Sequence, residues 1–410
     1  MDLKQLIKEE EEECDGRHQQ VDAKLALQSF LDRIPITSIL YHNPNASSDL
    51  ELKSDDCVRD AISLLYTNNV SGAPIVENVD SDLRKFVDRD IGFIEFSSMV
   101  LWSLEELKKV RAESKSDDDG LLSVLEQNSQ IGQTKIGELA KSFLWEPFFP
   151  VNSNDTLFHV LLLFAKHPRL GVIPVVESSN SRVMCYINQN AVVQLLLQSS
   201  GLDWFDQIAD KSIAEFGFEK ACRFFSVYGD QTITDAWHIL WKEETDGVPV
   251  IDQGSETLIG VVRRSDVHLL LDDDGIFKNR KNITIEQFIK THSKSHQKPN
   301  MSTDNISKMQ LSSCALLLEH DLLPRANTVI TNQKSDSLKQ VMKSLVASNS
   351  SQSFLVNESG KLEGILTLKD VISPFSPPSL DSRINGGGFF NAALEQADCH
   401  VKDGTLFCNN

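Results

Sequence analysis

Residues 364–370 read GILTLKD, an apolar run followed by a threonine and, three positions later, by an aspartate. The apolar run is typical of a strand, and the residues after it are typical of the start of a helix. Thr367 and Asp370 have the spacing of a capping box, in which both side chains bond to free backbone N–H groups at the helix start. The same two side chains could instead hold a ligand, and these seven residues leave both interpretations open.

Three other segments of the chain have the same layout as GILTLKD and its surroundings. Each contains a helix-period stretch, a short apolar strand, a polar turn, a second strand and a further helix. The first strands are GAPIVEN (72–78), GVIPVVES (171–178), GVPVIDQ (247–253) and SFLVNES (353–359). The first three carry a proline at the same place, and Phe354 replaces it in the fourth. The sequence therefore predicts four repeats.

The remaining elements follow the same spacing in every repeat. Helices before the first strands are expected at 57–69, 154–167, 231–244 and 335–348. The second strands are DIGFIEF (90–96), RVMCYIN (182–188), TLIGVVR (257–263) and KLEGILT (361–367), and helices are expected after them at 97–107, 189–198, 264–273 and 368–375. The unit is β-α-β-β-α, which is too small to bury both faces of its sheet alone. We therefore expect an α/β fold in which the repeats pack together.

The repeats suggest a division of the whole chain. We expect an acidic N-terminal segment at 1–30, repeats at 31–110, 131–200, 205–273 and 283–375, a polar insertion at 291–310 inside the fourth repeat, and a flexible C-terminal tail at 376–410. The insertion is rich in polar residues, so we expect a flexible loop there.

Charge and composition exclude several classes of protein. The chain has 40 basic and 59 acidic residues and a formal charge of −19, so its surface repels nucleic-acid phosphates and anionic lipid. No stretch approaches the roughly 20 uninterrupted apolar residues of a membrane-spanning helix, and we expect no nucleic-acid and no membrane partner. The 7 cysteines have no close pairs, which argues against a disulfide framework or a metal site. Because the N-terminus lacks an export signal, we expect a cytoplasmic protein, with the nucleus left open.

The repeat unit resembles a known family. Its layout, its Gly-x-Pro strand and its closing segment are similar to the cystathionine-beta-synthase (CBS) domain. Four copies with little else, over roughly residues 31 to 375, resemble the gamma-type regulatory subunit of the AMP-activated and sucrose-non-fermenting-related protein kinases. The segments KHPRLGVIPVVE (166–177) and CYINQNAV (185–192) are most similar to the plant branch. The resemblance implies four CBS repeats that form two tandem pairs packed as a disk.

The resemblance also implies where a ligand binds, because in CBS domains of known function the closing motif holds the ribose of adenosine. A carboxylate can accept both ribose hydroxyls, and the N–H groups at a helix start favour phosphate. The fourth copy is complete at Thr367 and Asp370, and the third keeps Asp266 but has Arg263 in place of the hydroxyl. The first and second copies have no aspartate at this place. We expect the nucleoside site in copy four, with an altered one in copy three.

A nucleotide phosphate also needs nearby cations. The second repeat has His167 and Arg169 before its first strand, where gamma-type subunits have a His-Arg pair that reaches phosphate, although Pro168 separates the two here. The third repeat offers Arg263 and Arg264. Two other interpretations stay open: the arginines pair with surface carboxylates, and the histidine interacts with the dipole at the end of its helix.

The sequence offers no support for catalysis, since it has no Gly-rich phosphate loop, no G-x-S-x-G elbow and no H-E-x-x-H motif. The resemblance implies a non-catalytic regulatory subunit that binds AMP, ADP or ATP. Its partners would be an alpha-type catalytic subunit and a beta-type scaffold subunit of a heterotrimeric Ser/Thr kinase. Two alternatives keep the same fold: a ligand-free CBS scaffold or adaptor of the kinase complex, and a CBS regulator of an unrelated partner.

Overall fold

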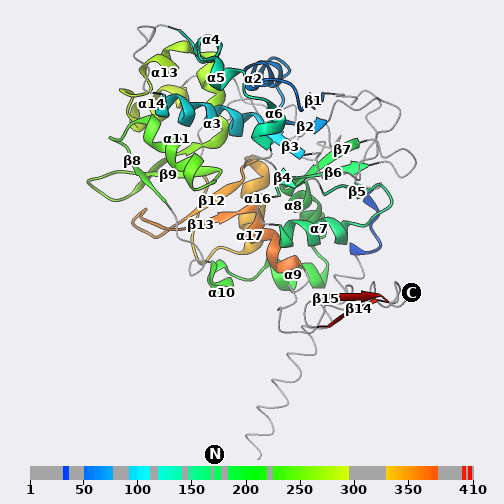
Figure 1. Ribbon diagram of the computed structural model, residues 1–410. Coiled ribbons are helices and arrows are strands. Elements are labelled where there is room, and N and C mark those ends of the chain that lie inside the picture. The colour runs from blue at the N-terminus through cyan, green and yellow to red at the C-terminus, as the bar shows by residue number, and fades with distance from the viewer. Residues whose placement is uncertain are drawn as a thin grey trace, which may run out of the picture.

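The computed structural model describes residues 31–36, 50–76, 92–110, 119–140, 146–147, 149–167, 170–176, 183–218, 225–294, 329–376, 399–402 and 405–408. The N-terminal segment predicted at 1–30 and most of the tail predicted at 376–410 lie outside these residues. Figure 1 shows small sheets with helices packed between and around them. A separate hairpin is formed by β14 (Cys399–Lys402) and β15 (Thr405–Cys408).

Each repeat forms one sheet in which a short strand runs parallel to a central strand and a third strand runs antiparallel to it. The short strands are β1 (Leu52–Lys53), β5 (Val151–Asn152), β8 (Val227–Tyr228) and β11 (Thr331–Asn332). The central strands are β2 (Gly72–Val76), β6 (Val172–Val176), β9 (Gly247–Ile251) and β12 (Gln352–Val356). The third strands are β3 (Gly92–Glu95), β7 (Val183–Asn188), β10 (Leu258–Arg263) and β13 (Leu362–Thr367), and β4 (Glu146–Pro147) pairs with β3. The two predicted strands of every repeat are confirmed.

One helix connects the short strand to the central strand, and a second follows the third strand. The connecting helices are α2 (Val58–Thr67), α7 (Leu157–Lys166), α11 (Ile233–Lys242) and α16 (Leu338–Ala347). The following helices are α3 (Phe96–Lys109), α8 (Gln189–Gln198), α12 (Leu269–Asp272) after the 3-10 helix η5 (Arg264–His268), and α17 (Leu368–Ile372) before the 3-10 helix η7 (Ser373–Phe375). The predicted β-α-β-β-α unit is confirmed.

The connecting helices form because their apolar residues recur at three and four positions. In α11 the buried residues are Ile233, Ala236, Trp237 and Leu240, which cover one side of the helix. Thr232 starts this helix with a capping box. The helix therefore presents one apolar face to the sheet and the neighbouring helices.

The helix predicted at 264–273 is present, and its first part is of the 3-10 type. Residues 264–268 form the 3-10 helix η5. The carbonyl of Ser265 lies 2.6 Å from Nδ1 of His268, so this side chain takes an acceptor that an α-helix would use for its backbone.

Further helices connect the repeats. They are α4 (Leu121–Gln127), α5 (Ser129–Gly132), α6 (Ile136–Leu139), α9 (Asp203–Ala209), α10 (Ile213–Phe216), α13 (Asp274–Asn279) and α14 (Ile285–Lys294). Helix α14 includes residues 291–294, which were predicted as the start of a flexible insertion. The helix continues there because Ile285 and Phe288 anchor it in the core. Residues 295–310 lie outside the described ranges. No helix in the described part of the chain is long and apolar enough to cross a membrane.

Repeats 1 and 2 form one pair, and repeats 3 and 4 form the other, by an exchange of short segments. In each pair, the segment that precedes one repeat bonds to the other repeat. These N–H···O bonds are Ile36 to Asp155 (2.8 Å), Ile136 to Asp56 (2.9 Å), Ile213 to Asp336 (2.9 Å) and Ile285 to Gln231 (2.9 Å). The predicted boundaries assign these segments to the repeat that follows them, whereas their hydrogen bonds go to the other repeat of the pair.

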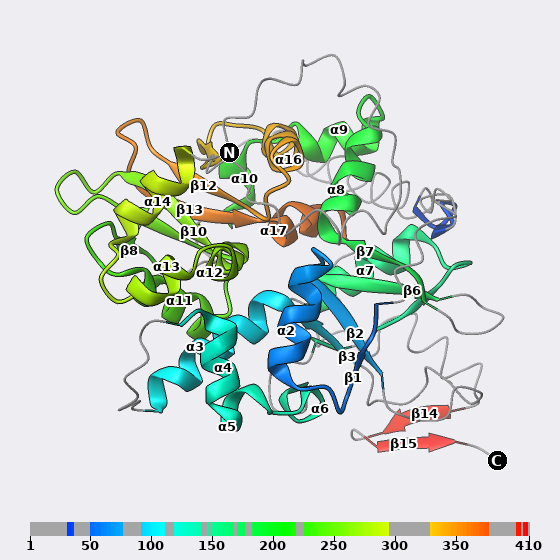
Figure 2. The same cartoon turned by 90° about the horizontal axis from the view of Figure 1, so that it is seen from above.

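Helices then join the two pairs. One hydrophobic core contains residues of repeats 1 and 3, with α2 and α3 beside α11 and η5. A second core contains residues of repeats 2 and 4, with α7 and α8 beside α16 and α17. Figure 2 shows the four repeats around a common centre. Each repeat thus contacts one neighbour through its sheet and another through its helices, which confirms the predicted fold of two packed pairs.

Candidate functional site

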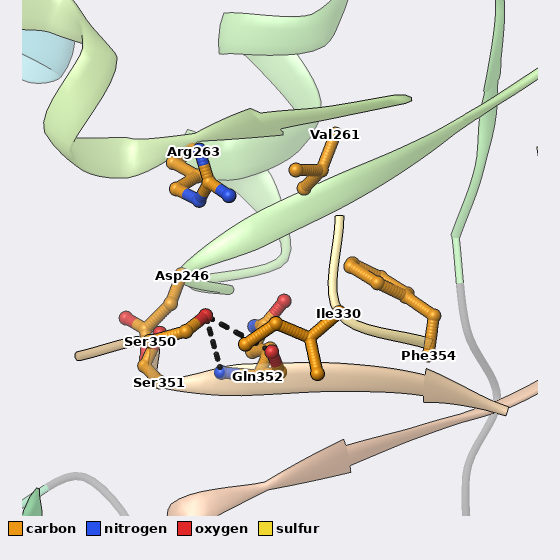
Figure 3. Close-up of a pocket in the computed structure, with 8 residues that line it drawn as sticks. All are labelled: Asp246, Val261, Arg263, Ile330, Ser350, Ser351, Gln352 and Phe354. Carbon is orange, nitrogen blue, oxygen red and sulfur yellow. Dashed lines mark hydrogen bonds between the residues drawn. The ribbon is translucent and has the colours of Figure 1, made fainter. Parts of the chain in front are cut away.

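A cleft separates the sheets of repeats 3 and 4 (Figure 3). It is lined by Asp246, Val261 and Arg263 from repeat 3 and by Ile330, Ser350, Ser351, Gln352 and Phe354 from repeat 4. At the hairpin tips the two sheets touch, since the Leu258 N–H donates to the Gly360 carbonyl at 3.0 Å. The cavity has a volume of about 10 Å³, which is space for about one water molecule.

The closing motifs occupy the same place in all four sheets. The residue at the hydroxyl position of each motif pairs with the first residue of the central strand and is the N-cap of the following helix. The pairs are Gly72 with Glu95, Val172 with Asn188, Gly247 with Arg263 and Gln352 with Thr367. The alignment of the motifs by their glycines is confirmed, and every one of these positions starts a helix.

Thr367 and Asp370 form the capping box that their spacing allows. Asp370 Oδ2 accepts hydrogen bonds from the Thr367 N–H at 2.8 Å and from the Thr367 hydroxyl at 2.7 Å. The Asp370 N–H donates to Thr367 Oγ1 at 3.3 Å. Both residues are half-buried, and Thr367 is the cross-strand partner of Gln352 in the cleft wall. The pair therefore caps α17 at the edge of the cleft.

Repeat 3 supplies the opposite wall. Arg263 lines the cleft, and its N–H donates to Asp266 Oδ2 at 2.8 Å, so Asp266 keeps the capping role of the motif. Arg264 is outside the lining residues. Its N–H donates to the Asp246 carbonyl at 2.7 Å, and its Nε is buried without a hydrogen-bond partner among the described residues. The structure thus places Arg263 in one wall of the cleft and Gln352, the strand partner of Thr367, in the other, whereas Thr367 and Asp370 are not among the residues that line the cavity.

His167 belongs to repeat 2 and lies away from this cleft. It is the C-cap of α7, its N–H donates to the Leu163 carbonyl at 2.9 Å, and its ring centroid lies 4.4 Å from that of Phe149. This is the place where a charged histidine interacts favourably with a helix dipole. Arg169 lies outside the described residues, so the contribution of the His167–Arg169 pair to a phosphate site stays a prediction.

Sequence reasoning missed Gln352, whose side chain is 5% exposed and lines the cleft. The predicted strand began at Ser353 and left Gln352 in the preceding turn. The spacing held the signal, because the central strands begin two residues before Pro74, Pro174, Pro249 and Phe354. That register places Gln352 where repeats 1 and 3 have glycine and repeat 2 has valine.

Aromatic rings meet at the corresponding position between repeats 1 and 2. Phe93 and Tyr186, each opposite the proline of its own sheet, have ring centroids 5.6 Å apart. Burial, with a smaller effect of the Glu51 charge, raises the pKa of the Tyr186 hydroxyl. Repeats 3 and 4 have Val261 and Ile365 at these places, and Val261 lines the cavity between their sheets.

Metal binding has no support in the described part of the chain. No group of three or more His, Cys, Asp or Glu side chains there could hold a metal ion.

Comparison with known proteins agrees with this architecture. The family model of the CBS domain matches residues 221–273 and 330–376, which contain the sheets of repeats 3 and 4. The chain is 24% identical over 384 residues to the SNF1-related protein kinase regulatory subunit gamma-1 of Arabidopsis thaliana, covering 88% of this chain and 85% of that protein. It is 22% identical over 419 residues to the gamma-1-like subunit of the same organism, covering 86% of this chain and 88% of that protein.

A solved protein of Methanocaldococcus jannaschii, described as a proposed archaeal homologue of g-AMPK, has the same fold. The two structures have a TM-score of 0.52 and 16% sequence identity, and the match covers 84% of this chain and all (100%) of the archaeal chain. Together, the repeats and these matches show that the chain has CBS-domain sequence in repeats 3 and 4 and that it resembles, along most of its length, plant gamma-type regulatory subunits of SNF1-related kinases.

Proposed function

We propose that the chain is a non-catalytic gamma-type subunit of a heterotrimeric Ser/Thr protein kinase and that it senses AMP, ADP or ATP. The nucleotide would bind in the cleft between repeats 3 and 4. The observation that carries this proposal is the cleft itself, where Arg263 lies across from Gln352, the strand partner of Thr367. The similarity to gamma-type subunits supports the proposed partners, an alpha-type catalytic subunit and a beta-type scaffold subunit.

The side chains of the cleft suit a nucleoside phosphate. The Asp370 carboxylate can accept hydrogen bonds from ribose hydroxyls. The Arg263 guanidinium can pair with phosphate in a chain whose net charge of −19 otherwise repels anions. Val261, Ile330 and Phe354 provide apolar surface for a base.

Binding requires the cleft to open. A cavity of about 10 Å³ is far smaller than the roughly 300 Å³ of a small-molecule pocket, so the sheets of repeats 3 and 4 must move apart around a nucleotide. The helices of repeats 3 and 4 pack on those of repeats 1 and 2, so this movement would reach the other pair. A ligand that favours the open state would thereby change the surface offered to the kinase.

Calorimetric titration of AMP, ADP and ATP into wild type and Asp370→Ala tests the site. The matched control is Asp235→Ala, because Asp235 Oδ2 accepts from the Thr232 N–H at 3.0 Å and from the Thr232 hydroxyl at 2.7 Å in the same kind of capping box. Each variant loses a helix cap, at a cost of about 1 kcal/mol in stability. We expect only Asp370→Ala to lose nucleotide binding. Absence of binding to wild type, or equal binding by all three proteins, would contradict the site.

A ligand-free scaffold is the second candidate. It is favoured by the capping box, in which Thr367 and Asp370 already satisfy each other, and by the small cavity. This candidate predicts that AMP changes neither the thermal stability of the chain nor its association with a kinase. Thermal denaturation with and without AMP separates the two candidates.

Affinity purification of the full chain from cells, followed by mass spectrometry, tests the partners. We expect an alpha-type catalytic subunit and a beta-type subunit to be recovered together. Recovery of neither subunit would favour a CBS regulator of an unrelated partner.

A further inference from the structure

Gln352 places a buried, unpaired hydrogen-bond acceptor in the cleft. The residue is 5% exposed, and its Oε1 has no hydrogen-bond partner among the described residues. A buried acceptor that has lost its water and gained no partner is unfavourable, so such groups are few in folded proteins. The cleft therefore contains an acceptor suited to a donor from outside the chain.

The contacts of Thr245 fix which end of the carboxamide is unpaired. The Thr245 hydroxyl donates to the Gly247 carbonyl at 3.3 Å, so its oxygen is left to accept. Gln352 Nε2 donates to that oxygen at 3.4 Å. If the carboxamide were turned round, its oxygen would face a hydroxyl whose proton is already in use. Oε1 is thus the group that needs a donor.

A glycine on the opposite sheet makes room for this arrangement. A β-carbon built at Gly247 would lie 2.8 Å from Gln352 Oε1, which is too close for a normal contact. The carboxamide of repeat 4 therefore reaches across the cleft to the first residue of the central strand in repeat 3. In the other pair, the central strands begin with Gly72 in repeat 1 and Val172 in repeat 2. Val172 occupies the position of Gln352, but a valine side chain has no hydrogen-bond acceptor.

We propose that Gln352 selects the base of the ligand, with Oε1 accepting a hydrogen bond from the exocyclic amine of a 6-aminopurine. This inference rests on the proposed function and names the residue that reads the base in the same cleft. A glutamine carboxamide is well suited to the amine of adenine. A 6-oxopurine would place its carbonyl oxygen against Oε1, so two acceptors would face each other and both would stay unpaired.

Calorimetric titration with AMP and IMP tests this selection, because the two nucleotides differ at position 6 of the base. We expect wild type to bind AMP about tenfold more tightly than IMP, the effect of about one hydrogen bond to a buried group. In Gln352→Met, which keeps the length of the side chain and removes the acceptor, we expect the ratio of the two affinities to fall to about one.

Gln340→Met is the matched control. Gln340 is an exposed residue of the same repeat, and its Oε1 accepts from the Ser337 N–H at 2.8 Å outside the cleft. We expect this variant to keep the wild-type ratio. Gly247→Ala is a second, independent variant, because its methyl group displaces Oε1 while Gln352 remains, and it should lower the ratio as well.

Each outcome decides a separate point. An unchanged ratio of AMP to IMP affinity in Gln352→Met would overturn the role of Gln352 and leave the nucleotide site in place. Tighter binding of AMP by Gln352→Met would also overturn it, since the side chain would then obstruct the cleft. Absence of binding of either nucleotide to wild type would remove the proposed function, and with it this inference.

Discussion

The places where the two sheets of each pair face each other share a backbone register and differ in the side chains that lie there. Between repeats 1 and 2, the rings of Phe93 and Tyr186 meet. Between repeats 3 and 4, the same register holds Val261 and Ile365, and a small polar cavity remains beside Gln352. One repeat unit has therefore produced an aromatic contact in one pair and a polar cleft in the other.

The difference shows how function can be confined to part of a repeat protein. The sheets are built alike in all four repeats, and in each repeat the same position is the N-cap of the following helix, although the side-chain contacts of these caps differ. What lies between the sheets depends on a few side chains. They are the first residue of each central strand, such as Gln352, and the residue of the third strand that pairs with the third residue of the central strand, such as Val261. Changes at those positions decide whether a cavity or an aromatic contact lies between the two sheets of a pair, without altering the fold.

The largest effect is expected from Tyr186→Ala, which removes the ring that packs on Phe93. We expect the free energy of unfolding to fall by about 3 kcal/mol, because the deletion leaves a gap between two sheets. Urea unfolding of the purified chain measures this loss. Tyr228→Ala is the control, since Tyr228 is 45% exposed, and it should change stability by less than about 0.5 kcal/mol. Equal losses in both variants would show that the aromatic contact does not hold the first pair together.

A smaller effect is expected from Gly247→Ala in the second pair. The added methyl group would lie 2.8 Å from Gln352 Oε1, so the carboxamide must shift, and we expect a loss of about 1 kcal/mol. Thermal denaturation measures it. In the control Gly364→Ala, the nearest side-chain atom is Leu355 Cδ1 at 3.3 Å, and we expect a smaller loss. If Gly247→Ala were the more stable variant, the cleft would be looser than the structure indicates.

The smallest effect is expected at the hairpin tips of the second pair, where Lys361 Nζ lies 2.7 Å from Glu256 Oε2. Lys361 holds the pKa of Glu256 below its ordinary value of 4.5. The ion pair therefore stabilises the fold above pH 4.5, and this contribution is lost as the pH falls through the lowered pKa. In low salt, we expect Lys361→Met to remove the part of the pH dependence of stability that this ion pair causes. In high salt the ion pair is already screened, so we expect the substitution to change the pH dependence little.

Thermal denaturation at pH 7 and pH 3 compares Lys361→Met with Lys343→Met, an exposed lysine of α16. The same pH response in both variants would show that the tips contribute nothing to the pairing of repeats 3 and 4.

The sequence predicted the repeat unit and most of its elements because these depend on local patterns. Thr367 and Arg263 were correctly aligned, since strand alternation and cap residues fix them within one repeat. Contacts between repeats were not predictable in the same way. The meeting of Phe93 with Tyr186, and of Gln352 with Gly247, joins residues far apart in the chain, and no local pattern records which repeats face each other. The 3-10 geometry of η5 was not predictable from the helix pattern, because the contact of His268 Nδ1 with the Ser265 carbonyl depends on one side chain.

The exchanged segments have a consequence for how the chain folds as it leaves the ribosome. Ile213 emerges early, but its partner Asp336 is among the last residues of its pair to be made. Repeat 3 in turn is closed by Ile285, which precedes repeat 4. Repeat 3 therefore has its closing segment before repeat 4 is made, whereas the segment around Ile213 has to wait for repeat 4, so the pair is complete only when both repeats have been synthesised. A chain cut between repeats 3 and 4 would leave the segment around Ile213 without its partner in repeat 4, which makes quality control sensitive to truncation there.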